Sequence, residues 1–188
     1  MNAMATDAPP FGPTAALRVS ATARAGGPAG LASRVEQLEA FYRWVHTERM
    51  QGLPILNPAL QVEAVGFRLL DGDGMVAGGV LITPWFMSLV CLPLTWQDGG
   101  QRIGCKRERA FGNQCFEFIG AHDPAIGWHE ACALFSPMGG FDRHELARET
   151  ACAVLASLFA EGQKTSVAPG DRASRRAFLL GRRAGASS

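Results

Sequence analysis

The chain has little of the patterning that marks several common classes of protein. Its formal net charge is only +1, so it lacks the strong overall attraction to nucleic acid of a basic protein. Five cysteines occur without a Cys-x-x-Cys pair, which argues against a zinc or iron site and against a secreted disulfide scaffold. We therefore expect reduced, largely buried thiols in a cytoplasmic protein with no metal or cofactor. They are Cys91, Cys105, Cys115, Cys132 and Cys152.

A long uninterrupted apolar segment is also missing. Residues 74–97 carry no charge and are numerous enough for a membrane helix. Glycines at 78 and 79 and prolines at 84 and 93 divide this run into short pieces. We therefore predict two buried strands here and no membrane insertion.

Catalytic motifs are absent from the sequence as well. There is no Gly-x-Ser-x-Gly elbow, and the glycines between 72 and 79 lack the Lys-Ser/Thr of a phosphate-binding loop. Glu117 and Glu130 are spaced carboxylates, but single acids on strands usually face solvent. The four histidines are scattered. These observations predict a protein that is not an enzyme.

The chain has 188 residues, and 47% of them are hydrophobic. This hydrophobic content is enough for one globular core. Ser33-Arg34-Val35-Glu36 has the form of a capping box and predicts a helix to about Met50. Asp142-Arg143-His144-Glu145 predicts a second helix, ended by Gly162. Leu53, Ile55 and Leu56 lie in the loop after the first helix, where we expect them to pack on the core.

Six strand-like runs separate the helices, and turn residues such as Asp98-Gly99-Gly100 divide them. The predicted strands cover 61–70, 76–83, 86–92, 102–109, 113–120 and 128–135. Short connections favour antiparallel neighbours in a meander. The predicted fold class is α+β, an antiparallel sheet of about five or six strands flanked by an N-terminal and a C-terminal helix. The predicted divisions are a disordered segment over 1–30, one domain over 31–170 and an Arg-rich tail over 171–188.

The tail resembles a twin-arginine export signal placed at the wrong end of a chain. Residues 171–188 hold five arginines against Asp171, a net +4, which leaves about −3 for the remainder. No apolar region or cleavage site follows, so we expect the segment to act in place. Three apolar side chains between two arginine pairs indicate docking. The candidate residues are Arg175, Arg176, Phe178, Leu179, Arg182 and Arg183.

Two further segments combine proline with apolar side chains at predicted strand ends. In the first, Pro84 interrupts a strand ladder and places its neighbours near a sheet rim, where they suit an apolar binding surface. A place in the core accounts for these residues equally well. The candidate residues are Thr83, Pro84, Trp85, Phe86 and Met87, together with Ser136, Pro137 and Met138 of the second segment.

In this order and spacing, Thr83-Pro84-Trp85-Phe86-Met87, Phe135-Ser136-Pro137-Met138 and residues 175–183 resemble the HybE-type assembly chaperones of NiFe hydrogenases. Asn57-Pro58 also fits. The resemblance covers roughly residues 33–185. It implies a cytoplasmic, non-catalytic protein that binds the small-subunit precursor and holds back its twin-arginine export until maturation is complete.

Some relatives implied by this resemblance carry a fused rubredoxin-like domain and are linked to hydrogenase assembly in oxygen. This chain lacks the Cys-x-x-Cys pairs of such a domain, so a rubredoxin-like protein is expected as a separate partner, alongside other maturation factors. An alternative remains open at this point. A redox or metal-carrying maturation factor would use the scattered cysteines, provided that the fold brings them together.

The role of the tail also has alternatives. Its likeness to the client signal allows it to occupy the client site as a competitive placeholder, whereas a solvated Arg-rich tail matches such a signal by coincidence. In a third role the arginines contact an acidic client surface. A nucleic-acid role is disfavoured, because no second basic aromatic patch accompanies the tail.

Overall fold

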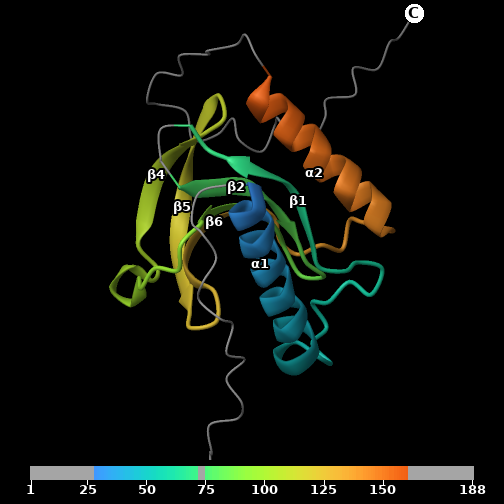
Figure 1. Cartoon of the computed structure of the whole chain (residues 1–188). Helices are drawn as coiled ribbons and strands as arrows, with labels where there is room; N and C mark the ends of the chain where they lie inside the picture. Colours follow the sequence, from blue (N-terminus) through green and yellow to red (C-terminus); the bar gives the residue numbers. More distant parts are fainter. Residues whose placement is uncertain (1–27, 72–74, 161–188) are drawn as a thin grey trace, which may run out of the picture.

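The structure is a computed structural model and describes residues 28–71 and 75–160 (Figure 1). Most of the predicted N-terminal segment and the whole predicted tail lie outside the described residues. Between them, two helices and six strands follow one another as the sequence predicts. The predicted α+β class is confirmed.

The two helices differ from prediction mainly at their first residues. Helix α1 covers Pro28–Arg49, so it begins before the predicted Ser33. Proline is well suited to the first helical turn, and Ser33 lies within the helix. Helix α2 covers His144–Phe159, close to the prediction. Its N-cap is Arg143, which makes no side-chain capping bond, so the predicted motif begins one residue before the cap.

All six predicted strands form. They are β1 (Glu63–Leu69), β2 (Val76–Ile82), β3 (Met87–Pro93), β4 (Lys106–Phe111), β5 (Gln114–Asp123) and β6 (Gly127–Phe135). The fourth begins later than predicted because Gly100–Arg102 forms a short 3-10 helix.

The sheet is not a simple meander. Its strand order is β1-β2-β3-β6-β5-β4, so β3 pairs with β6 and β4 lies at the outer edge. Every neighbouring pair is antiparallel. The connection over 94–105 must cross three strand spacings, about 14 Å, which its length easily allows. The predicted simple meander is therefore wrong at this one connection.

The helices cover opposite faces of the sheet, and α1 crosses the front in Figure 1. Leu81 and Val90 pack with Leu38 of α1, whereas Val80 and Leu89 pack in the cluster that includes α2. Successive strand residues point to opposite faces, which accounts for this division. Strands β2 and β3 are buried almost throughout, as the absence of charge predicts.

A buried arginine attaches α1 to the ends of the sheet. Arg34 donates from Nε to the Pro93 carbonyl at 3.0 Å and from Nη2 to the Ile126 carbonyl at 2.8 Å. Its Nη1 donates to Gln37 at 2.8 Å. Burial lowers the pKa of Arg34, but the guanidinium keeps its charge because its ordinary pKa is so high. The carbonyl groups therefore replace the water that this cation has lost.

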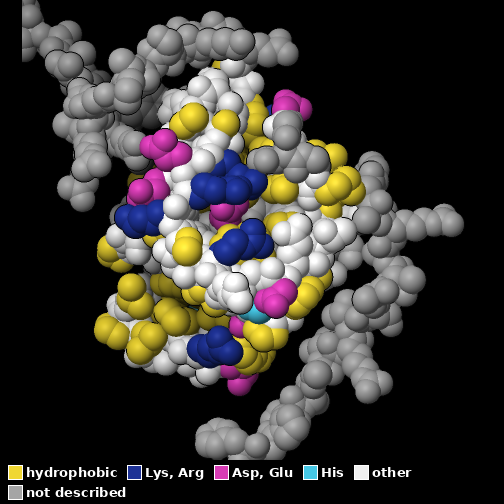
Figure 2. Space-filling model, turned by 90° about the vertical axis from the view of Figure 1, so that its left-hand side faces the viewer, with side chains coloured by type: hydrophobic (Ala, Val, Ile, Leu, Met, Phe, Trp, Pro, Cys, Tyr) yellow, Lys and Arg dark blue, Asp and Glu magenta, His cyan; other side chains and the backbone are white. Residues whose placement is uncertain are grey.

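The face that contains β4 is charged and paired. Figure 2 shows basic and acidic side chains side by side over its centre, with hydrophobic side chains gathered at its lower left. Lys106 lies 3.0 Å from Glu117, and Arg109 lies 3.0 Å from Glu130. Arg107 also contacts Glu130, at 3.2 Å. Since acids neutralise these basic side chains, the face offers no cationic track of the kind that binds nucleic acid.

Candidate functional site

Three loops meet at one end of the sheet, and the described candidate residues lie in two of these loops or, for Met87, at the adjoining start of β3. Ile82 at the end of β2 pairs with Met87 at the start of β3. Met87 also pairs with Phe135 at the end of β6. The turn over 83–86 and the segment over 136–143 therefore leave the sheet side by side, and the loop over 53–59 joins them through Asn57.

Thr83 fixes the turn between β2 and β3. Its hydroxyl donates to the Phe86 carbonyl at 2.9 Å and accepts the N–H groups of Phe86 at 2.9 Å and Trp85 at 3.3 Å. The Thr83 N–H also donates to the Phe86 carbonyl, at 2.8 Å. Thr83 itself is fully buried. It therefore shapes the turn from inside the protein.

Trp85 and Phe86 are half-buried and belong to an aromatic cluster with α1. The Trp85 ring centroid lies 5.6 Å from that of Phe86 and 6.0 Å from that of His46. Tyr42 meets Phe86 edge to face at 5.7 Å. Because each ring is held by another, the exposed part of Trp85 is presented in a fixed orientation.

The two candidate methionines lie in the core. Met87 and Met138 are both 0% exposed and belong to the cluster between the sheet and α2. Pro84 is also buried. Ser136 and Pro137 are exposed, and the peptide bond between them is cis. Of the described candidates, Trp85, Phe86, Ser136 and Pro137 thus reach the surface, while Thr83, Pro84, Met87 and Met138 support them from inside.

A groove lies beside these residues. It has a volume of about 700 Å³ and is shallow and widely open to solvent. One wall comes from the loop after α1 and the other from the segment before α2. Its lining residues are Pro54, Ile55, Leu56, Asn57, Pro58, Ala59, Pro137, Gly139, Phe141 and Asp142.

Apolar side chains near this groove face solvent. Leu53 is 44% exposed and Ile55 is 43% exposed, so the expectation that they pack on the core is wrong. Leu56 is half-buried and lines the groove. Gly52 has φ of +76°, and Pro54 and Pro58 further restrict the loop, which turns these side chains outward. Exposed apolar side chains gathered at a rigid groove are typical of binding sites.

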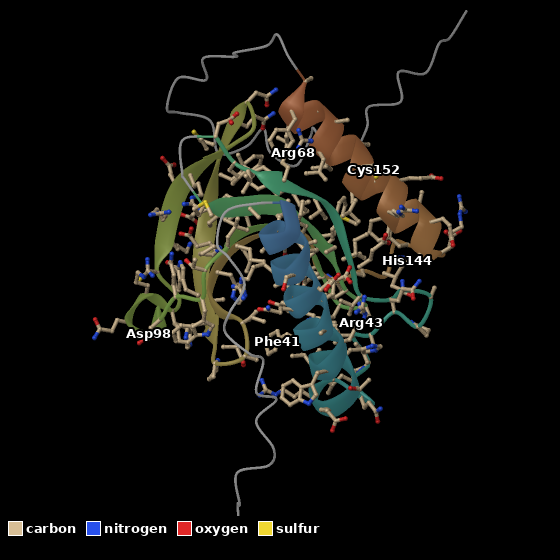
Figure 3. The ribbon with its side chains drawn as sticks, in the orientation of Figure 1. Phe41, Arg43, Arg68, Asp98, His144 and Cys152 are labelled. Carbon is tan, nitrogen blue, oxygen red and sulfur yellow. The ribbon has the colours of Figure 1, made fainter. Side chains whose placement is uncertain are left out.

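A second hollow, of about 380 Å³, lies between α1 and α2 at the start of β1. Figure 3 shows Arg43 on α1 and His144 at the start of α2 on its two sides. Glu63 lies 2.7 Å from His144 Nε2 and 3.1 Å from Arg148 Nε. Glu63 thus ties β1 to α2, and this largely polar hollow offers little to an apolar ligand.

The cysteines do not converge. Cys91 is buried and Cys132 is half-buried, but Cys105, Cys115 and Cys152 are exposed, so the expectation of largely buried thiols holds for only some of them. Within residues 28–71 and 75–160, no three metal-binding side chains gather at one point. The described part of the chain thus contains no metal site built from the cysteines.

The tail candidates lie outside the described residues. They are Arg175, Arg176, Phe178, Leu179, Arg182 and Arg183.

In the part of the chain that the structure describes, neither helix has the length and hydropathy needed to cross a bilayer.

Comparison with known proteins defines the class of protein to which this chain and its fold belong. Residues 33–181 match the family described as NiFe-hydrogenase assembly chaperone, HybE. The chain is 40% identical over 162 residues to Protein HoxT of Cupriavidus necator, covering 80% of this chain and 89% of that protein. It is 39% identical over 150 residues to the probable rubredoxin HupJ of Rhodobacter capsulatus, covering 78% of this chain and 53% of that protein.

A solved structure supports the fold. The solution structure of HybE from Escherichia coli matches with a TM-score of 0.53 and 22% identity, covering 81% of this chain and 91% of that one. The chain belongs to the HybE family of NiFe-hydrogenase assembly chaperones. The family match ends at residue 181, so it includes Arg175 to Leu179 and leaves out Arg182 and Arg183.

Proposed function

We propose that this protein is a non-catalytic chaperone that binds the small-subunit precursor of a NiFe hydrogenase in the cytoplasm, before twin-arginine export. Family membership supports the hydrogenase assignment. The observation that carries the binding role is the apolar groove, where Ile55 and Pro137 are exposed. The turn that contains Trp85 is joined to one wall by the hydrogen bond from the Asn57 N–H to the Pro84 carbonyl. A signal peptide has an apolar region of variable sequence, and such a region suits a surface of proline, aliphatic and aromatic side chains.

The arrangement of the groove suits this task. Its walls are built from proline-restricted loops, so little conformational entropy is lost when a segment binds. Its ligand contacts are mostly apolar, which tolerates changes in client sequence better than a set of directed hydrogen bonds. The proposed partners therefore share an apolar segment, and the tail arginines add contacts to acidic client surface.

Affinity capture of the tagged protein tests this function. Cells that make a membrane-bound NiFe hydrogenase should yield the small subunit with its signal peptide still attached, identified by mass spectrometry. The matched control is a Trp85→Ala protein, which should stay folded and recover much less precursor. Captured protein that carries no hydrogenase subunit would contradict the proposal, and stoichiometric iron or zinc after anaerobic purification would support a metal-carrying factor.

A link to oxygen is the remaining part of the proposal. Among the relatives, HupJ is named a probable rubredoxin, and this chain matches only 53% of its length. A separate rubredoxin-like protein would then act with this chaperone. The same capture under air and under anaerobic growth should recover that protein together with the precursor, and more of it under air.

A further inference from the structure

Asn57 occupies the point where the three loops of the groove meet. Its N–H donates to the Pro84 carbonyl at 2.9 Å. Its Nδ2 donates to the carbonyls of Met138 at 3.0 Å and Phe141 at 2.6 Å. The side-chain oxygen accepts the N–H of Ala59 at 3.0 Å. One residue thus connects the turn beside Trp85 with both walls of the groove.

The chemistry of this position calls for asparagine. Two donors must leave one side-chain nitrogen towards two carbonyl oxygens, while an acceptor on the same group receives a backbone N–H. An ionised aspartate has the same shape but no donor, and it would place negative charge against two carbonyl oxygens. Glutamine keeps the amide but moves it by one methylene. Serine has only one hydroxyl hydrogen to donate.

The two bonds from Nδ2 cross the groove. Asn57 lies on the wall over 54–59 and Phe141 on the opposite wall. Met138 belongs to the same segment as Phe141, with its side chain buried in the core. The second wall closes a turn of its own, in which the Phe141 N–H donates to the Met138 carbonyl at 3.2 Å. Asn57 is bonded to both ends of that turn. Its loss would therefore release the second wall and Pro137 from the first.

We propose that Asn57 is the positioning residue of the client groove, setting the distance between its walls through the hydrogen bonds of its own side chain. The inference rests on the proposed function for the identity of the client. The effect of Asn57 on the two walls of the groove can be measured without any client. Loss of Asn57 should thus impair binding far more than it impairs folding.

Asn57→Asp is the direct test, and Asn113→Asp is the matched control. Asn113 also ties a loop to a neighbouring segment, since its Nδ2 donates to the Ser157 carbonyl at 3.1 Å and its N–H to the Leu158 carbonyl at 2.7 Å. It lies near the last residues of α2, whereas the groove lies before the first. Both variants make the same chemical change to an amide that donates to backbone.

Binding is measured with the purified small-subunit precursor, and folding with urea unfolding of each variant. Asn57→Asp should weaken binding by at least about tenfold, as expected when two hydrogen bonds that hold the site are lost. Asn113→Asp should leave the affinity within about twofold of wild type, since distant sites act independently. Equal losses of affinity in the two variants would overturn the inference and leave Asn57 a merely structural role.

Hydrogen exchange supplies a readout that does not depend on the client. In Asn57→Asp, amide hydrogens over 83–86 and 136–142 should exchange at least about tenfold faster, while those of β2 and β3 keep their wild-type rates. Unchanged exchange in these loops would overturn the inference. If the loops loosen but wild-type protein does not bind the precursor, the proposed function fails and the positioning role stands.

Asn57→Ala is a second test variant, to be used if Asn57→Asp does not fold. It removes both donors without adding a charge, and the same losses of affinity and loop protection are expected. If neither variant folds, Asn57 is required for the whole fold, and a specific role in positioning the groove is overturned.

Discussion

The Tyr42 hydroxyl lies 3.3 Å from Nε2 of His129, a histidine that is only 2% exposed. Nδ1 of His129 lies 3.3 Å from the Gly127 carbonyl, which can only accept, so Nδ1 carries the proton of the neutral ring. Nε2 then accepts from Tyr42. Burial raises the pKa of Tyr42 to about 12, so its hydroxyl keeps the proton that it donates.

This pair predicts a loss of stability in mild acid. Burial lowers the pKa of His129 from its ordinary value of 6.5. Below pH 6.5 the unfolded chain binds a proton at this position and the folded chain does not, so the free energy of unfolding should fall by up to about 1.4 kcal/mol per pH unit. Urea unfolding at pH 7.5, 6.5 and 5.5 measures this slope.

The variant His129→Gln isolates the contribution of His129 from those of the other histidines. Glutamine does not titrate, so its free energy of unfolding should change less between pH 7.5 and 5.5 than that of wild type. Identical slopes for the two proteins would show that His129 is not the group responsible.

Met87 and Trp85 should respond differently to truncation. Met87→Ala removes a fully buried side chain and should lower the free energy of unfolding by about 2–5 kcal/mol. Trp85→Ala changes a half-buried ring in the turn over 83–86, which Asn57 ties to the groove, and should keep the fold while weakening precursor binding. Calorimetry and binding assays on both variants check the contrast. A folded Trp85→Ala protein with full affinity would count against the proposed site.

Arg34 should be more important for stability than an exposed arginine on the same helix. Arg34→Met leaves the carbonyls of Pro93 and Ile126 without this donor and should cost about 2–4 kcal/mol. Arg43→Met breaks only an exposed pair with Glu39 and should cost less than about 1 kcal/mol. Chemical denaturation of both variants measures the difference, and similar midpoints would refute it.

Alanine substitutions at Gly112 and Gly104 should lower stability by different amounts. Both have positive φ, +63° and +76°. A Cβ at Gly112 would lie 2.1 Å from the Leu158 carbonyl oxygen, whereas one at Gly104 meets nothing within 4 Å. Gly104→Ala should cost about 1 kcal/mol through its backbone conformation alone. Gly112→Ala should cost more, because the β4–β5 turn must also move away from α2; equal thermal midpoints would contradict this.

Substitution of the tail arginines should change the affinity for the precursor in a salt-dependent way. Changing Arg175, Arg176, Arg182 and Arg183 to Ala should weaken precursor affinity at low salt and have less effect at high salt, if these residues contact acidic client surface. Deletion of 171–188 should instead tighten binding if the tail acts as a placeholder. Binding titrations at two ionic strengths separate the two roles, and unchanged affinity in both variants would assign the tail neither.

Much of the fold follows from local pattern. Strands β2 and β3 are predictable because an uncharged run broken at Pro84 has few other structures open to it. The first residue of α1 is not predictable in this way. Ser33-Arg34-Val35-Glu36 has the pattern of a helix cap, although the helix begins at Pro28. The position of β4 at the far edge depends on pairing between β3 and β6, which no local pattern reveals.

The site shows the same division. Trp85 is predicted at the rim of the sheet because Pro84 interrupts a strand ladder there, and Pro137 is predicted at the end of a strand. Met87 and Met138 look equally suitable in sequence, but alternation along the strand and the turn before α2 direct them inward. Ile55 resembles a core residue, and its exposure depends on where the proline-rich loop meets Phe141. Gly52 and the nearby prolines were the available signal.

The two walls of the groove are far apart in the sequence, with Asn57 and Met138 separated by 81 positions. Between them lie all six strands, including β6, whose pairing with β3 brings the second wall into place. A ribosome must therefore have released nearly the whole domain before the groove exists, and an incomplete copy cannot compete for whatever binds there. A client bound in this groove therefore shows that β6 of the chaperone has already paired with β3.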